Sequence, residues 1–296
     1  MSTYSHIKEG HQQYMSLSNP ERINSLYESC WINYPKTKEI INLLKDLMGR
    51  PKKPRMQNLL IIGESNIGKT SIITQFSLAH PDKVIEDEDS LTKAIKSVIV
   101  VQFPASADER GLYISILEQF WVPFKATEPV SNLRHQAVHL LRECGVKILI
   151  MDEVHNLLAG TAAKQRMVMN VLKSLGNDLQ VSLVGVGTTD AALILNSDPQ
   201  HMSRYDVVHL PKWELDKNFG GLLKAFELRL PLKKASKIIE KEKAQLLFTY
   251  SRGNLGDLHK LLIACAKQAI ETGEERITAD IIKNEGKAIQ QNRVRV

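Results

Sequence analysis

Eight consecutive residues have the types and spacing of a phosphate-binding loop. They fit the pattern G-x-x-x-x-G-K-[ST] and are Gly63, Glu64, Ser65, Asn66, Ile67, Gly68, Lys69 and Thr70. Backbone N–H groups of such a loop, with the N-terminus of the following helix, point at phosphate oxygens. The Lys69 ammonium would reach the β- and γ-phosphates, and the Thr70 hydroxyl would bind Mg²⁺. A glycine turn with an incidental lysine is the alternative, and the preceding apolar strand and following helical pattern disfavour it.

A pair of carboxylates follows another apolar run. Ile148–Met151 is succeeded by Asp152 and Glu153. Because ligands bind at the carboxyl edge of parallel strands, Asp152 is expected to complete the Mg²⁺ site. Glu153 would orient and polarise the water that attacks the γ-phosphate. Without other motifs, such a pair marks an exposed strand end about as often as it marks a nucleotide site. Together with the phosphate loop, the pair predicts hydrolysis of ATP, with ATP and Mg²⁺ as cofactors.

Two further polar positions could act on the phosphate. Thr188 follows the run Val181–Val186, where its hydroxyl could contact the γ-phosphate or the attacking water, although a turn residue capping a helix is an equally good interpretation. Arg204 precedes the last apolar run. An arginine supplied by another subunit can stabilise charge on a transferring phosphoryl group. As an isolated residue, Arg204 is more often a surface ion-pair partner.

The elements that must position these residues alternate between short apolar runs and longer helical patterns. This alternation over residues 58–210 is typical of a parallel sheet with crossover helices. The runs are apolar on both faces, as buried parallel strands are. The fold class predicted is α/β, a P-loop core with a five-stranded parallel sheet flanked by helices, and the strands are Leu59–Ile62, Val98–Phe103, Ile148–Met151, Val181–Val186 and Val207–Leu210.

The chain outside this core is predicted to be helical. Residues 1–57 read as an N-terminal helical segment and linker, 58–210 as the ATPase core and 211–296 as a small helical domain. In the last of these, helices are expected near 217–230, 236–250, 255–272 and 279–290. The formal net charge of +6 lies entirely in 211–296, which holds 17 basic and 11 acidic residues. This excess suggests either a surface for a polyanion or an ordinary solvated helical face.

Composition favours a cytoplasmic protein without membrane helices. Cys30, Cys144 and Cys265 lie far apart without CxxC spacing, and an odd count suits a reducing compartment. The first residues lack the pattern of a targeting peptide. No apolar run approaches the ~18 residues that a membrane helix requires.

The motifs together resemble the AAA+ ATPases and, within them, the TniB family of transposition ATPases, which is related to TnsC and more distantly to MuB. The closer resemblance rests on Met56–Thr70, Pro104–Arg110, Asp152–Gly160 and Gly185–Thr188, and covers roughly residues 25–285. It implies that 211–296 is the helical lid that follows an AAA+ core. It also implies that Thr188 is the sensor-1 residue and Arg204 the arginine finger acting in trans.

The resemblance implies partners as well as a fold. Family members are ATP-controlled homo-oligomers, rings or helical filaments, that bind duplex DNA without sequence specificity, recruit a DDE-type transposase and work with a target-selection protein. By analogy with pore loops of relatives, Arg110, Lys125 and Arg134 are candidate phosphate contacts, although each is individually more often an ordinary surface charge. The lid departs from the family pattern, because His259 and Lys260 stand where a sensor-2 arginine is usual.

Three functions compete on this sequence. The first is an ATP-dependent regulator of DNA transposition whose hydrolysis is slow. The second is a helicase loader or a replication-initiator-type AAA+ protein, which shares the same core. The third is a scaffold that binds nucleotide and hardly hydrolyses it, and Glu153 argues against this scaffold because it supplies the group that hydrolysis needs.

Overall fold

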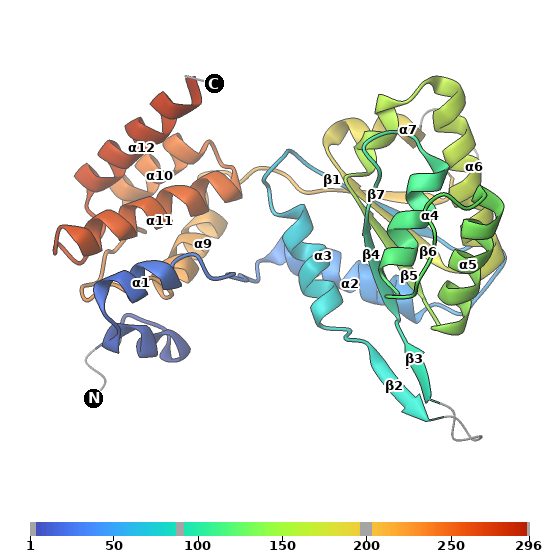
Figure 1. Ribbon diagram of the computed structural model, residues 1–296. Helices are drawn as coiled ribbons and strands as arrows, with labels where there is room; N and C mark the ends of the chain where they lie inside the picture. The colour runs from blue at the N-terminus through green and yellow to red at the C-terminus, as the bar shows by residue number, and fades with distance from the viewer. Residues whose placement is uncertain (1–3, 87–91, 196–202, 295–296) are drawn as a thin grey trace. The chain divides into compact units, whose positions relative to one another are not determined.

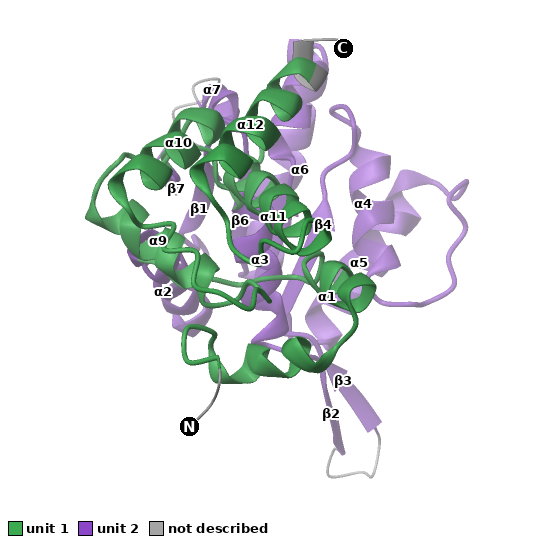
Figure 2. Cartoon of the chain, turned by 90° about the vertical axis from the view of Figure 1, so that its left-hand side faces the viewer, with its two compact units in different colours: residues 1–34, 66–68, 211–296 green, residues 35–65, 69–210 purple. Residues whose placement is uncertain are grey.

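The computed structural model describes residues 4–86, 92–195 and 203–294 (Figure 1). Contacts divide the chain into two compact units, coloured separately in Figure 2. Unit 1 comprises Met1–Tyr34, Asn66–Gly68 and Pro211–Val296, and unit 2 comprises Pro35–Ser65 and Lys69–Leu210. Among the described residues, no helix has both the length and the apolar character needed to cross a membrane.

Unit 2 is built on a five-stranded parallel sheet, which confirms the predicted fold class. The strands are arranged in the order β4-β5-β6-β1-β7. Every residue of β1, β5 and β6 is buried, because helices cover both faces of a parallel sheet. The strands are β1 (Asn58–Ile62), β4 (Val98–Gln102), β5 (Ile148–Asp152), β6 (Ser182–Gly187) and β7 (Tyr205–His209). The strands that carry the two predicted nucleotide motifs, β1 and β5, are therefore separated by β6.

Helices lie on both sides of this sheet (Figure 1). One layer contains α4, α5 and α6, which contact one another and share one apolar core with the strands. The other layer contains α2 and α3, which also contact each other. The helices of unit 2 are α2 (Pro35–Gly49), α3 (Lys69–Leu78), α4 (Glu109–Glu118), α5 (Val130–Glu143), α6 (Ala162–Leu179) and α7 (Ala192–Leu195), with the 3-10 turns η2 (Val154–Ala159) and η3 (Thr189–Ala191).

A two-stranded hairpin, absent from the sequence-based prediction, extends away from the sheet (Figure 1). It pairs β2 (Lys83–Glu86) with β3 (Thr92–Ile95) in antiparallel register. Its strands are short and largely exposed, and Val84 is 70% exposed. Because neither strand contributes to a core, the hairpin lacks the apolar alternation by which a half-buried strand is recognised.

Unit 1 packs the two ends of the chain into one helical core. Leu26 and Ile32, from the N-terminal segment, are buried among apolar residues of the last four helices. The Lys8 N–H donates to the Leu228 carbonyl at 2.7 Å, which adds a backbone link. The elements are η1 (Glu9–Ser16), α1 (Asn19–Ser25), α9 (Lys217–Glu227), α10 (Lys241–Ser251), α11 (Leu255–Glu271) and α12 (Ala279–Val294). The contacts thus place residues 1–34 with the C-terminal helices and residues 35–57 with the sheet.

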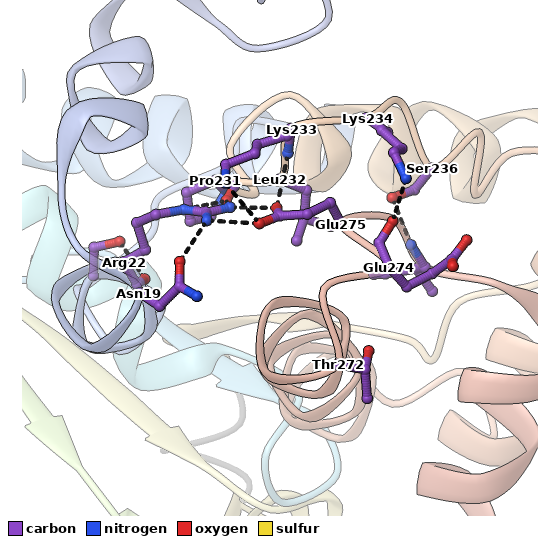
Figure 3. Close-up of polar contacts among 12 residues, drawn as sticks. Asn19, Arg22, Pro231, Leu232, Lys233, Lys234, Ser236, Thr272, Glu274 and Glu275 are labelled. Carbon is purple, nitrogen blue, oxygen red and sulfur yellow. Dashed lines mark hydrogen bonds and ion pairs between the residues drawn. The ribbon is translucent and has the colours of Figure 1, made fainter.

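A buried ion pair joins the two ends inside unit 1 (Figure 3). Arg22 is 1% exposed and its guanidinium donates to both carboxylate oxygens of Glu275, at 2.9 and 2.6 Å. It also donates twice to the Pro231 carbonyl and once to the Asn19 side chain. The Lys233 N–H and ammonium complete the coordination of Glu275. All five donors of the guanidinium are therefore engaged, which is what a buried arginine requires.

Candidate nucleotide site

The predicted phosphate loop connects β1 to α3. The β1 strand ends at Ile62 and α3 begins at Lys69, so the first N–H groups of α3 are free of helical partners and face the loop. Gly68 has φ of 100°, a conformation that L side chains rarely adopt. The second glycine of the motif is therefore required by the backbone geometry that turns the chain into the helix.

Lys69 is held inside the loop. Its side chain is buried, and the ammonium donates to the carbonyls of Gly63 at 2.9 Å and Glu64 at 2.7 Å. Burial lowers the pKa of Lys69, and the charges of Glu153 and Asp152 partly oppose that effect. A buried cation that donates only to neutral carbonyls of its own loop gains free energy when an anion approaches. This environment suits the binding of phosphate groups.

Thr70 and Asp152 meet at the carboxyl edge of the sheet. The Thr70 hydroxyl donates to Oδ2 of Asp152 at 2.7 Å, although the two residues lie on different, non-adjacent strand–loop units. A hydroxyl and a carboxylate oxygen are hard donors of the kind that Mg²⁺ prefers. In the described part of the chain, no group of three or more His, Cys, Asp or Glu side chains could hold a metal. The pair therefore fits a Mg²⁺ ion that takes its other ligands from nucleotide phosphates and water.

Glu153 lies on the turn directly after β5. Its backbone is left-handed, with φ of 56° and ψ of 33°, which is unusual for a residue other than glycine. Its N–H donates to Oδ1 of Asp152 at 2.9 Å, so the strained turn is held by the neighbouring carboxylate. Strained backbone of this kind persists where the surrounding structure imposes it, and it occurs often at functional sites.

His155 contacts the Glu153 carboxylate and was not identified from the sequence. Its Nε2 lies 3.2 Å from Oε2 of Glu153, and its Nδ1 is buried without a hydrogen-bond partner in the described structure. The one sequence signal for this contact was the position of His155 two residues after Glu153. The imidazole therefore lies beside the carboxylate at the end of β5.

Thr188 is brought to the same edge by the strand next to β1. It follows Gly187, which pairs with Ile62 in the sheet and accepts a hydrogen bond from the Gly63 N–H at 3.2 Å. A Cβ at Gly187 would lie 3.2 Å from the backbone nitrogen of His155, so the end of β6 closely approaches the turn that carries Glu153. The structure thus gathers Lys69, Thr70, Asp152, Glu153 and Thr188 at one edge of one sheet.

Arg204 lies at the opposite edge of the sheet. Its carbonyl accepts a hydrogen bond from the N–H of Asn58, where β1 begins, at 2.8 Å. Its guanidinium donates to the Asn177 side chain at 3.0 Å. Arg204 therefore does not belong to the phosphate site of its own chain, and its predicted action on a neighbouring subunit's nucleotide stays a prediction.

The three candidate DNA contacts have different surroundings. The Arg110 guanidinium donates to the carbonyls of Ala126 and Glu128 and so holds the connection between α4 and α5. Arg134 forms an ion pair with Asp178 at 2.7 Å. Lys125 is exposed. Two of the three cations thus already have protein partners, and their contact with DNA remains a prediction.

His259, one of the two residues that the family resemblance puts near the sensor-2 position, is a packed imidazole. His259 stacks on the ring of Phe226 with centroids 5.7 Å apart, and burial lowers the pKa of His259. Lys260 is exposed. The environment of His259 favours a neutral ring, which does not reproduce the charge of a guanidinium.

Solved structures similar to this chain share its fold at low sequence identity. ORC2 from Aeropyrum pernix, as ADPNP-ADP complexes, is 15% identical with a TM-score of 0.60, covering 89% of this chain and 71% of that chain. Cdc6p from Pyrobaculum aerophilum is 18% identical with a TM-score of 0.64, covering 90% and 70%. ORC1 from A. pernix in complex with DNA is 16% identical with a TM-score of 0.58, covering 92% and 70%. This likeness shows that the chain shares its fold with these proteins.

Sequence comparison gives the family. No curated protein matches the chain. The family profile described as bacterial TniB protein matches residues 22–215, a span that includes the phosphate loop, the Asp152–Glu153 pair, Thr188 and Arg204. Because this match extends over well over half of the residues, the chain belongs to the TniB family.

Proposed function

We propose that this protein is an ATP-dependent regulator of DNA transposition that oligomerises on duplex DNA and recruits a DDE-type transposase. Membership of the TniB family supports the role in transposition. A target-selection protein is a further expected partner. The observation that carries the ATP-dependent part is the 2.7 Å hydrogen bond between Thr70 and Asp152, which joins the two nucleotide motifs at one sheet edge.

The residues at this edge have different roles in the proposed hydrolysis. The loop N–H groups and the Lys69 ammonium bind and orient the β- and γ-phosphates. Mg²⁺, held by Thr70 and Asp152, would neutralise phosphate charge. Glu153 accepts a proton from the attacking water through its carboxylate, and Thr188 donates to the γ-phosphate or positions that water. Hydrolysis is expected to be slow, and the lifetime of the ATP-bound state would then set how long the assembly stays on DNA.

The alternative function is that of a replication initiator or helicase loader. The fold likeness to ORC and Cdc6p proteins favours it, and an identity of 15–18% carries no more than the fold. The two functions differ in their protein partner. A transposition regulator retains a transposase on DNA, whereas a helicase loader retains a replicative helicase.

Electron microscopy with duplex DNA and a non-hydrolysable ATP analogue tests the proposal. Rings or filaments that require nucleotide are expected, and a monomer under these conditions contradicts the proposal. Lys69→Ala should prevent assembly because the phosphates lose their cation. Tyr27→Ala is the matched control, since this exposed side chain lies in unit 1 and outside the site.

A second measurement separates the two functions. The DNA-bound wild-type assembly is mixed with the purified transposase or with the purified helicase, and co-sedimentation is measured. Retention of the transposase, lost in Lys69→Ala, is expected. Retention of the helicase alone would favour the alternative function. DNA binding that falls steeply with salt and does not depend on sequence would agree with contacts to the phosphate backbone.

A further inference from the structure

One tryptophan of unit 2 is almost fully exposed. Trp121 lies in the connection between α4 and α5, which Figure 2 shows as an extended segment beside these helices, and it is 91% exposed. Phe120 before it is buried, and Val122 and Phe124 after it pack against the core. Because its neighbours on both sides are anchored, the backbone presents the indole to solvent in a fixed position.

The backbone at Trp121 makes this exposure more unusual. Its φ is 54°, in the left-handed region, three residues after α4 ends at Glu118. Glycine or asparagine is the common choice where a helix ends in this conformation. A tryptophan here is conformationally strained and also leaves a large apolar surface in water. Burial of the indole against a partner would remove this apolar surface from water.

A groove of about 740 Å³ lies between α4, α5 and α6 of the same unit. Its walls combine apolar and cationic side chains, among them Tyr113, Arg134, Arg166, Met167 and Val171. Met167 is 45% exposed, and Arg134 is held in place by Asp178. Guanidinium groups stack on the electron-rich face of an indole, and a methionine sulfur contacts aromatic rings favourably. The groove therefore has the chemistry that a tryptophan side chain requires.

We propose that Trp121 of one copy of this chain inserts into the α4–α6 groove of a second copy. The indole and the groove are chemically complementary, and within one chain each lacks the other. Trp121 follows the end of α4, whereas Tyr113, Arg134 and Met167 of the groove lie on α4, α5 and α6. Each copy thus donates a tryptophan at one place and accepts one at another. Such head-to-tail contacts continue from copy to copy and build rings or filaments.

The inference rests on the proposed function, because it names the surfaces through which the proposed oligomer forms. Self-association of the full-length protein is measured by sedimentation velocity with Mg²⁺, a non-hydrolysable ATP analogue and duplex DNA. Trp121→Ala should weaken it by on the order of thirtyfold, as loss of an interface hot spot does. Trp121→Phe should retain part of the association, and Tyr27→Ala, which removes an exposed side chain of unit 1, should not change it.

A mixing experiment tests the head-to-tail geometry. Met167→Glu blocks the groove but leaves Trp121 intact, whereas Trp121→Ala leaves the groove intact. At a protein concentration just high enough for the wild type to assemble, the roughly thirtyfold loss should leave each variant alone monomeric. Their equimolar mixture should form dimers and nothing longer, because one tryptophan and one groove remain to be paired. Thermal unfolding checks that both exposed positions leave the fold unchanged.

The outcomes separate this inference from the proposed function. If wild type assembles and Trp121→Ala assembles equally well, the inference is overturned and the proposed function stands. If the mixture forms no dimers, the inference is also overturned. If Trp121→Ala weakens DNA binding of the monomer with self-association unchanged, the indole faces DNA and the inference is wrong. A wild-type monomer under all conditions overturns both proposals.

Discussion

Unit 1 and unit 2 each bury a cation, and they surround it differently. In unit 1 the Arg22 guanidinium has five hydrogen bonds, two of them to the Glu275 carboxylate. In unit 2 the Lys69 ammonium donates to two neutral carbonyls of its own loop. The carboxylates at the phosphate site of unit 2 have other partners: Asp152 accepts from Thr70, and Glu153 contacts His155.

The pKa shifts describe the same contrast. Burial raises the pKa of Glu275, but hydrogen bonds from Arg22 and Lys233 and the charge of Arg22 outweigh it, and the pKa falls to about 2. The pKa of Lys69 is lowered as well, chiefly by burial. A lowered pKa favours the charged form of an acid and the neutral form of a base. The surroundings in unit 1 therefore favour the charged carboxylate, whereas burial in unit 2 disfavours the charged ammonium until an anion such as a phosphate approaches.

The largest effect is expected at Glu153. Glu153→Gln should lower the rate of ATP hydrolysis by about 10²–10⁴-fold, because the amide cannot accept the proton of water. ATP binding should persist, and the DNA-bound state should last longer. Single-turnover hydrolysis and nucleotide titration measure the two properties separately. Loss of ATP binding in this variant would show that Glu153 has a different role, and the comparison between the units would fail for this carboxylate.

The next largest effect is expected at Arg22. Arg22→Ala should destabilise unit 1 by about 3–5 kcal/mol, because it leaves the carboxylate of Glu275 buried with only Lys233 beside it. Denaturant unfolding measures this change when it is followed by tryptophan fluorescence in a Trp121→Phe background, where the remaining Trp31 and Trp213 both lie in unit 1. Replacing both partners, as Arg22→Met with Glu275→Leu, should recover much of the loss. A single substitution that costs less than about 1 kcal/mol would mean that the pair contributes little.

A smaller effect is expected from acid. The folded pKa of Glu275, about 2, lies below the ordinary glutamate pKa of 4.5, so the unfolded state binds a proton more readily. The stabilisation that the charged Glu275 carboxylate contributes is fully present above pH 4.5 and is lost as the pH falls from 4.5 toward 2. It should amount to at most about 3 kcal/mol. Unit 1 should therefore lose stability in this window, and Glu275→Gln should remove this part of the pH dependence.

The smallest effect on stability is expected at Lys69. Without nucleotide, Lys69→Ala should change the free energy of unfolding by less than about 1 kcal/mol, because the lost hydrogen bonds are offset by relief of a buried charge. With ATP, the wild type should gain thermal stability and the variant should not. Differential scanning calorimetry with and without ATP measures both. A strongly destabilised variant would make Lys69 resemble Arg22 and would break the contrast between the units.

The sheet was predictable from the sequence because its strands are buried on both faces. Ile148–Met151 and the other strands of the sheet are continuous apolar runs, and such runs indicate burial on both faces. The β2–β3 hairpin has no such apolar run, since its residues are largely exposed to water. The placement of the N-terminal segment in unit 1 was also beyond reach. Arg22 and Glu275 are ordinary charged residues in the sequence, and only their partners in the folded chain distinguish them.

The candidate site was predictable where spacing along the chain carries the chemistry. The phosphate loop is contiguous, so its pattern specified the residues that lie between β1 and α3. His155 was missed because its role depends on a 3.2 Å contact across a turn. The engagement of Arg110 by carbonyls of a later loop was likewise invisible, because a basic residue in a sequence does not reveal whether its charge faces protein or solvent.

The division of unit 1 between the two ends of the chain has a consequence for the order of folding during synthesis. Arg22 leaves the ribosome 253 residues before Glu275. Through that interval the N-terminal segment cannot close its ion pair or bury Leu26 and Ile32 against the C-terminal helices. The strands of unit 2 emerge meanwhile in one continuous stretch and can form their sheet. A chain released early would therefore carry a folded sheet and an N-terminal segment with no core to join.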